Sequence, residues 1–138
     1  MICLICEIRS EMYTPEAFRI YSACMYRPSL EKYADTVANY LSDPETHCFA
    51  SFEGKHLIGM IVVRNGEILG IAVLDAFRNQ GTGRALIEHS QQLYPVLIAE
   101  TDDDSVGFYR RCGFSCEAFD RTFPDGIITR YRCIRNSF

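Results

Sequence analysis

Two closely spaced glycines mark the segment of this sequence that most clearly indicates a ligand-binding site. Residues 78–84 read Arg-Asn-Gln-Gly-Thr-Gly-Arg and follow an apolar run at residues 68–74. Gly81 and Gly83 let the backbone come close to a ligand. If a helix begins here, its first amide N–H groups are unpaired and carry a partial positive charge. The segment therefore predicts a site for a phosphate or pyrophosphate group, although a tight turn with close packing would also explain the two glycines.

The same glycines do not fit a dinucleotide-binding fingerprint. The third glycine of that pattern is missing, because position 86 is Leu. The chain also lacks a run of alternating βαβ units, which such a fold requires. A different phosphate-containing ligand is therefore expected.

The elements that must position this segment are predicted from hydrophobic periodicity and from helix and turn signals. Strands are expected at 2–9, 47–52, 57–64, 67–74, 95–100, 114–120 and 127–135, and helices at 15–23, 30–41, 81–93 and 104–111. Thr14 and Ser29 are suited to cap the first two helices. Asn65-Gly66 predicts a two-residue hairpin. This order indicates an α/β (α+β) fold with a mixed sheet and helices on both faces.

Composition places the chain among ordinary globular proteins. It has 138 residues, 48% hydrophobic and 23% charged, and we expect a single domain over residues 1–138. The net charge of −4 disfavours a nucleic-acid partner. No apolar run is long enough to span a membrane, and the first residues lack the features of a secretory signal.

Seven cysteines are an odd number for a disulfide framework, so a reducing cytoplasm is expected. A zinc site is not expected, because Cys3 and Cys6 would point to opposite faces of one strand. The cysteines are better explained as small apolar residues.

Two motifs together resemble one known family. Arg78, Gly81 and Gly83 follow a strand and are similar to the acetyl-CoA signature, Arg/Gln-x-x-Gly-x-Gly/Ala, of the GCN5-related N-acetyltransferases (GNAT). Residues 108–114 read Phe-Tyr-Arg-Arg-Cys-Gly-Phe and resemble the family's second motif, Phe-Tyr-x-x-x-Gly-Phe. Asp102 stands where the family usually has asparagine, and a helix-capping role would suit it as well as a contact with the cofactor.

The resemblance implies a GNAT-like sheet whose strands at 67–74 and 95–100 splay apart, with acetyl-CoA lying in the gap as co-substrate and no metal. The residues implied to bind it are Ile71, Ala72, Val73, Arg78, Asn79, Gln80, Gly81, Thr82, Gly83, Arg84, Asp102 and Phe108. The implied reaction is direct attack of a primary amine on the thioester. Core packing of residues 71–73 is compatible with this, because their backbones and side chains would act separately.

Two residues are implied to be catalytic. Tyr109 would donate a proton to the departing thiolate, and Glu67 would be the base. Glu67 could instead be an exposed hairpin residue, with a water relay in its place. A non-catalytic acyl-CoA-binding or sensing domain on the same fold remains the alternative function.

The sequence leaves the acceptor open. Acidic residues at 100–104 could attract a cationic amine, although a solvated helix cap would explain them as well. Arg130 and Arg132 share a strand face and could bind a carboxylate, although a solvated face is again an adequate explanation. A homodimer is possible, because exposed terminal strands often pair chains in this family.

Overall fold

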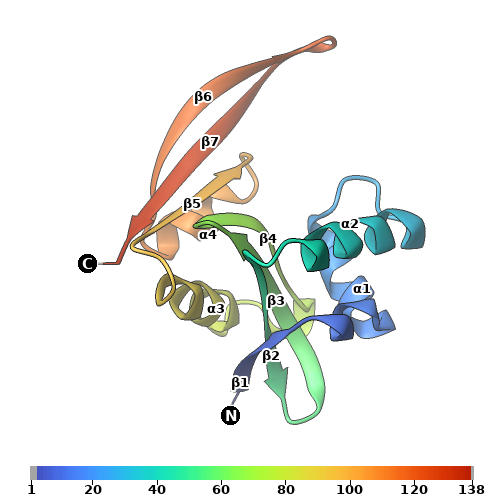
Figure 1. Cartoon of the computed structure of the whole chain (residues 1–138). Coiled ribbons are helices and arrows are strands. Elements are labelled where there is room, and N and C mark those ends of the chain that lie inside the picture. Colours follow the sequence, from blue (N-terminus) through green and yellow to red (C-terminus); the bar gives the residue numbers. More distant parts are fainter. Residues whose placement is uncertain (1–2, 138) are drawn as a thin grey trace.

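The computed structural model describes residues 3–137 and contains one seven-stranded sheet (Figure 1). The strands are β1 (Cys3–Ile8), β2 (Thr46–Glu53), β3 (His56–Arg64), β4 (Glu67–Val73), β5 (Val96–Thr101), β6 (Ser115–Phe123) and β7 (Gly126–Asn136). Their order in the sheet is β1-β2-β3-β4-β5-β7-β6. All neighbours are antiparallel except β4 and β5, which are parallel. The mixed sheet expected from the sequence is thus confirmed.

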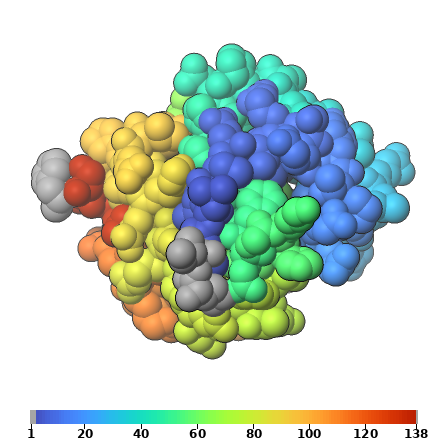
Figure 2. Space-filling view, turned by 90° about the horizontal axis from the view of Figure 1, so that it is seen from below, coloured from blue at the N-terminus to red at the C-terminus, as the bar shows by residue number. Residues whose placement is uncertain are grey.

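Four α-helices cover the two faces of this sheet. They are α1 (Pro15–Tyr21), α2 (Leu30–Ser42), α3 (Thr82–Gln91) and α4 (Val106–Arg111), joined by short 3₁₀ turns at Ser10–Tyr13, Ser22–Cys24 and Asp75–Phe77. Side chains of α3 and α4 share one buried cluster with one face, and those of α1 and α2 share a second cluster with the other. Figure 2 shows the N-terminal strand, in dark blue, lying between the yellow α3 and the green β2–β3 hairpin.

Local signals set the ends of these elements. The Thr14 side chain accepts a hydrogen bond from the Ala17 N–H, and the Ser29 side chain accepts one from the Lys32 N–H, as expected of helix N-caps. The hairpin between β3 and β4 has positive φ at both Asn65 (51°) and Gly66 (85°), the geometry of a type I′ turn.

An irregularity in β4 was not predicted. The pairing with β3 shifts between Val62 and Val63, so that Gly70 faces Val62 while Ile68 faces Val63 and Leu69 is left over. This is a β-bulge. Next to it, Tyr21 of α1 packs so closely that a Cβ on Gly70 would lie 2.2 Å from its hydroxyl oxygen. The Tyr21 and Tyr40 hydroxyls are hydrogen bonded (2.9 Å), which holds Tyr21 in place.

We expect Gly70→Ala to lower the free energy of unfolding by about 1–3 kcal/mol, the usual cost of overpacking a filled interior. Tyr21 is 1% exposed and cannot swing into solvent without losing its packing. Urea denaturation measures the change. Gly107→Ala in α4 is the control, because only the flexible end of Arg111 lies near that position. An equal effect of both changes, or none at Gly70, would contradict the steric explanation.

Candidate active site

The two central strands separate soon after they meet. The only residue pair between β4 and β5 is Glu67 with Ile98, and the Ile98 N–H donates to the Gly66 carbonyl (2.8 Å). By contrast, β3 and β4 pair from Arg64 to Gly59. Beyond Glu67 the edge of β4 is therefore open towards β5 (Figure 1). Its unpaired backbone groups can accept an extended ligand as an additional strand.

The glycine segment lies at the far end of β4, between this strand and α3. Asn79 (φ 63°) and Gly81 (φ 83°) both adopt left-handed conformations, and Gly81 caps α3 without a side-chain hydrogen bond. The first amides of α3 are consequently free of a capping side chain and suit an anionic ligand. Arg78 is exposed and ion-paired with Asp75 (3.2 Å). Gln80 is also exposed, and its side chain bonds to the Ala76 carbonyl.

Gly83 is the position where three elements meet. A Cβ here would lie 2.8 Å from Cζ of Phe108 on α4 and 3.9 Å from Val73 on β4. The need for glycine therefore comes first from Phe108, and not from a ligand alone. The next residue, Arg84, donates from its guanidinium to the Arg111 carbonyl at the end of α4. The two helices are thereby fixed beside the open edge of β4.

Among the residues of β4 expected to contact acetyl-CoA, side chains alternate between the two faces of the sheet. Ile71 packs against the α3–α4 cluster and Ala72 belongs to the α1–α2 cluster. Val73 is half-buried. Thr82 of α3 is buried and packs towards Gly59. These side chains pack in the core, while the backbone of β4 on the side of β5 stays available to pair with a ligand.

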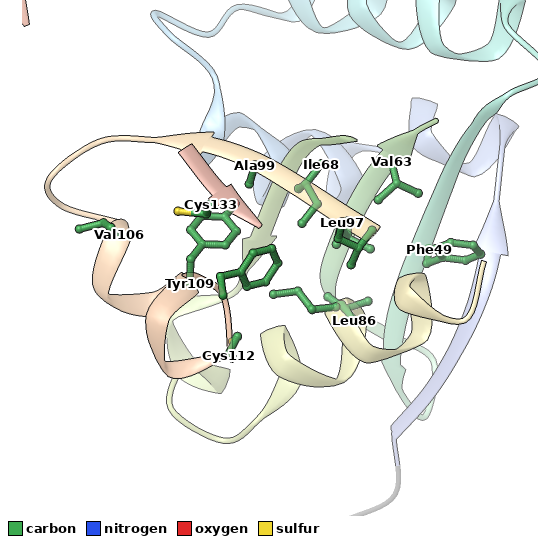
Figure 3. Close-up of a cluster of buried hydrophobic side chains, with 13 residues drawn as sticks. Phe49, Val63, Ile68, Leu86, Leu97, Ala99, Val106, Tyr109, Cys112 and Cys133 are labelled. Atoms are coloured by element: carbon green, nitrogen blue, oxygen red, sulfur yellow. The ribbon is translucent and has the colours of Figure 1, made fainter. Parts of the chain in front are cut away.

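Tyr109 is held rigidly beside the gap. Its ring contacts Phe108 and Phe114 edge-on, with centroids 5.3 and 5.2 Å away. Figure 3 shows it reaching from α4 towards Cys133 on β7. The residue is only 6% exposed, yet its hydroxyl makes no hydrogen bond with residues 3–137. Among residues 3–137, every fully buried side-chain oxygen has a hydrogen-bond partner. Because the Tyr109 hydroxyl has none, its oxygen must be partly accessible to solvent.

Burial raises the pKa of Tyr109 well above its usual value near 10, and nearby cysteines add to the effect. The phenol is therefore protonated throughout the neutral range. A protonated, unpartnered hydroxyl on a rigid ring can act as a proton donor.

Glu67 stands at the opposite end of β4 from the glycine segment and is exposed. It lines a pocket of about 340 Å³ together with residues of β5, β6 and β7. Ile98 and Glu100, which line the same pocket, alternate with the core residues Leu97 and Ala99. The pocket therefore opens on the α1–α2 face of the sheet, whereas Tyr109 lies on the α3–α4 face. A reacting group in the gap could be approached from both sides.

The acidic segment after β5 is largely used for structural contacts. Glu100 forms ion pairs with Arg121 and Arg130. The Asp102 carboxylate accepts the backbone N–H groups of residues 104 and 105, which is a turn that starts α4. Asp103 accepts from the Tyr131 hydroxyl (2.7 Å). Arginine therefore neutralises Glu100, whereas Asp102 and Asp103 accept from neutral donors and keep their charge. The turn that Asp102 forms just before α4 corresponds to the capping role considered for it.

One side chain near the gap was not anticipated. The Cys24 thiol donates to the Tyr21 carbonyl (3.1 Å) and lies near the Ile71 amide. Although the residue is exposed as a whole, desolvation of its thiol raises the pKa of Cys24 to about 11. The sequence could not reveal this position, because a cysteine at the end of a helix has no pattern that links it to a strand far along the chain.

Residues 3–137 contain no cluster of three or more His, Cys, Asp or Glu side chains arranged to hold a metal ion. None of the helices described here combines the length and apolar character needed to cross a membrane.

The split sheet, the glycine turn at a helix start and the Phe-Tyr pair on the following helix are the features that the resemblance of the sequence led us to expect. A model of the acetyltransferase (GNAT) family matches residues 14–114. The chain belongs to this family.

Solved structures support the same fold. The ribosomal-protein-S18-alanine N-acetyltransferase of Escherichia coli is 20% identical, with a TM-score of 0.73, covering 98% of this chain and 94% of that one. A Bacillus subtilis acetyltransferase in complex with CoA has the same identity and TM-score, covering 99% and 100%. An acetyltransferase from Thermus thermophilus is 16% identical, with a TM-score of 0.74, covering 99% and 97%. A search of curated protein sequences finds no match.

Proposed function

We propose that this protein is an N-acetyltransferase that moves the acetyl group of acetyl-CoA to a primary amine. The observation that carries the proposal is the unpartnered Tyr109 hydroxyl beside the open edge of β4, with the free amides of α3 at one end and Glu67 at the other. In the solved structures, the B. subtilis relative holds CoA, and one from Bacillus anthracis, 19% identical, holds acetyl coenzyme A. Acetyl-CoA is accordingly the proposed co-substrate.

The proposed binding mode uses groups that the fold leaves free. The amides at residues 80–84 would hold the pyrophosphate, and the backbone of Ile71 and Val73 would pair with the amides of the pantetheine arm. Phe108 would pack against that arm. Asn79, Arg78 and Arg84 shape or flank the loop, while Asp102 would act by fixing the start of α4.

The proposed reaction needs one proton removed and one supplied. An alkyl amine with a pKa near 10.4 is mostly protonated at pH 7, and deprotonating it costs about 4.6 kcal/mol. Glu67, directly or through water, would take that proton. The amine nitrogen then attacks the carbonyl carbon, the carbon–sulfur bond breaks, and Tyr109 protonates the leaving thiolate.

The proposal is tested by acetyl-CoA turnover over a panel of amines. Loss of the thioester absorbance is the preferred signal, because exposed Cys3 would react with a thiol reagent. Amine-dependent loss above the rate of hydrolysis supports the enzyme. Tight acetyl-CoA binding without turnover on any acceptor would instead favour a non-catalytic acyl-CoA sensor.

We expect Glu67→Gln to lower kcat/KM about 10²-fold at pH 7, the low end of the contribution of a positioned base. The deficit should shrink as the pH approaches the pKa of the amine, because the acceptor then needs no base. A pH series with a single amine measures this trend.

Glu117→Gln is the matched control for Glu67. Glu117 lines the same pocket and loses the same charge, but it lies on β6, beyond β5 and β7. A pH-independent loss, or an equal loss in both variants, would assign Glu67 an electrostatic role and not that of a base.

We further propose that residues 1–138 form one catalytic domain and act in the cytoplasm. The seven cysteines are all free, which suits a reducing compartment. Sedimentation of the purified protein tests whether it forms a homodimer.

A further inference from the structure

The pocket beside Glu67 is lined by three acidic and two basic side chains. Glu67, Glu100 and Glu117 line it together with Arg121 and Arg132, and Arg130 joins them by pairing with Glu100. Ile98, Ala99, Ala118 and Phe119 supply apolar wall. A mixed pocket of this kind is better suited to a ligand with both charges than to a simple cation.

The two arginines on the exposed face of β7 differ in their contacts. Arg130 is ion-paired with Glu100 (3.2 Å), and Arg121 pairs with the other oxygen of the same carboxylate. Arg132 makes no ion pair with any of residues 3–137, although it stands beside Glu100 on β5 and Glu117 on β6 in the strand register. Arg132 lines the pocket and Arg130 does not. Arg132 therefore offers an unused guanidinium.

The register also limits the separation of Arg132 from Glu67. In the strand register, Glu67 lies opposite Ile98, and Arg132 lies opposite Glu100, two residues further along β5. Neighbouring strands lie about 4.8 Å apart and rise about 3.3 Å per residue, which places the two Cα atoms about 12 Å apart. Both side chains are long and line the same pocket, so an acceptor of a few carbon atoms can contact both.

We propose that this pocket selects acceptors that carry a carboxylate as well as the reacting amine, with Arg132 holding the carboxylate and the amine lying towards Glu67. The planar guanidinium suits a carboxylate, with which it forms two parallel hydrogen bonds. The inference rests on the proposed acetyltransferase function, and it names small amino acids as the substrate class.

The test compares ω-amino acids with alkylamines of the same carbon number. The pairs are β-alanine with propylamine, γ-aminobutyrate with butylamine and δ-aminovalerate with pentylamine. We expect the wild-type protein to have a lower KM for at least one amino acid than for its partner amine. Arg132→Gln should raise that KM about tenfold, equivalent to about 1.4 kcal/mol, while the KM of the alkylamine and both kcat values stay within about twofold.

Arg130→Gln is the matched control. It removes the same charge from the same strand face, but Glu100 keeps Arg121 as its partner and the pocket lining is unchanged. The preference for the amino acid should survive this change. Loss of preference in both variants would show a general effect of charge and would overturn the role of Arg132.

A binding measurement separates this inference from the proposed function. Calorimetry follows the same amino acids binding to the protein saturated with CoA, in the wild type and in Arg132→Gln. Binding that Arg132→Gln weakens about tenfold supports the inference, even if no amine is acetylated. Turnover of alkylamines without any preference for amino acids would overturn it and leave the acetyltransferase function standing. Absence of both binding and turnover would overturn both.

Discussion

Tyr109→Phe is expected to lower kcat about 10²-fold while CoA binds with unchanged affinity. The loss is at the low end for general acid catalysis, because a thiol with a pKa near 8.5 is already a tolerable leaving group at neutral pH. Affinity should be retained because the ring contacts to Phe108 and Phe114 do not involve the hydroxyl. Steady-state turnover and a separate CoA titration measure the two effects.

Tyr131→Phe is the control for this experiment. It also removes one phenol oxygen, but that hydroxyl is bonded to Asp103 and is not free. Both variants must melt like the parent protein. Wild-type turnover in Tyr109→Phe would remove Tyr109 from the mechanism, and a loss confined to CoA affinity would make it a packing residue.

Gly83→Val is expected to weaken CoA binding about 100-fold, or about 2.7 kcal/mol. The Cβ of a side chain at this position would lie within 3 Å of two ring atoms of Phe108. The ring must therefore move, and its movement would disturb the proposed contact with the pantetheine arm. Calorimetry with CoA measures the loss, and unchanged affinity in a folded variant would contradict the site.

The double variant Gly83→Val, Phe108→Ala separates two causes. If the valine acts by displacing Phe108, the double variant should bind CoA about as well as Phe108→Ala alone. If the valine itself obstructs the pyrophosphate at the start of α3, the loss should persist in the double variant.

Much of the fold could be predicted because its signals are local. Thr14 and Ser29 cap helices through their own side chains, and the Asn65-Gly66 turn requires positive φ at two successive residues. Such features depend on a few neighbouring residues. The observed helices and strands differ from the predicted ones at their ends. Helix α3 begins at Thr82 and ends at Gln91, two residues before the predicted end at Leu93, and β6 extends to Phe123, beyond the predicted end at Asp120.

The features that the sequence could not reveal depend on distant residues. The bulge at Leu69 follows from the pairing of β4 with β3, and Gly70 is needed because Tyr21 packs on it. Gly83 was expected to make room for a ligand, but the atom nearest to its missing Cβ belongs to Phe108. The different availability of Arg130 and Arg132 depends on Glu100, which reaches them from another strand.

The early separation of β4 and β5 affects how the molecule opens as well as what it binds. Strands β1–β4 form one hydrogen-bonded unit and β5–β7 form another, with a single residue pair between β4 and β5. The two units are joined mainly by side chains, including Ile61 and Val63 on one side and Leu97 and Ala99 on the other. Sub-global opening should therefore separate them along this boundary, and amides there should exchange with solvent before those inside either unit. A bound acetyl-CoA would bridge both units, so its binding energy would slow this particular opening.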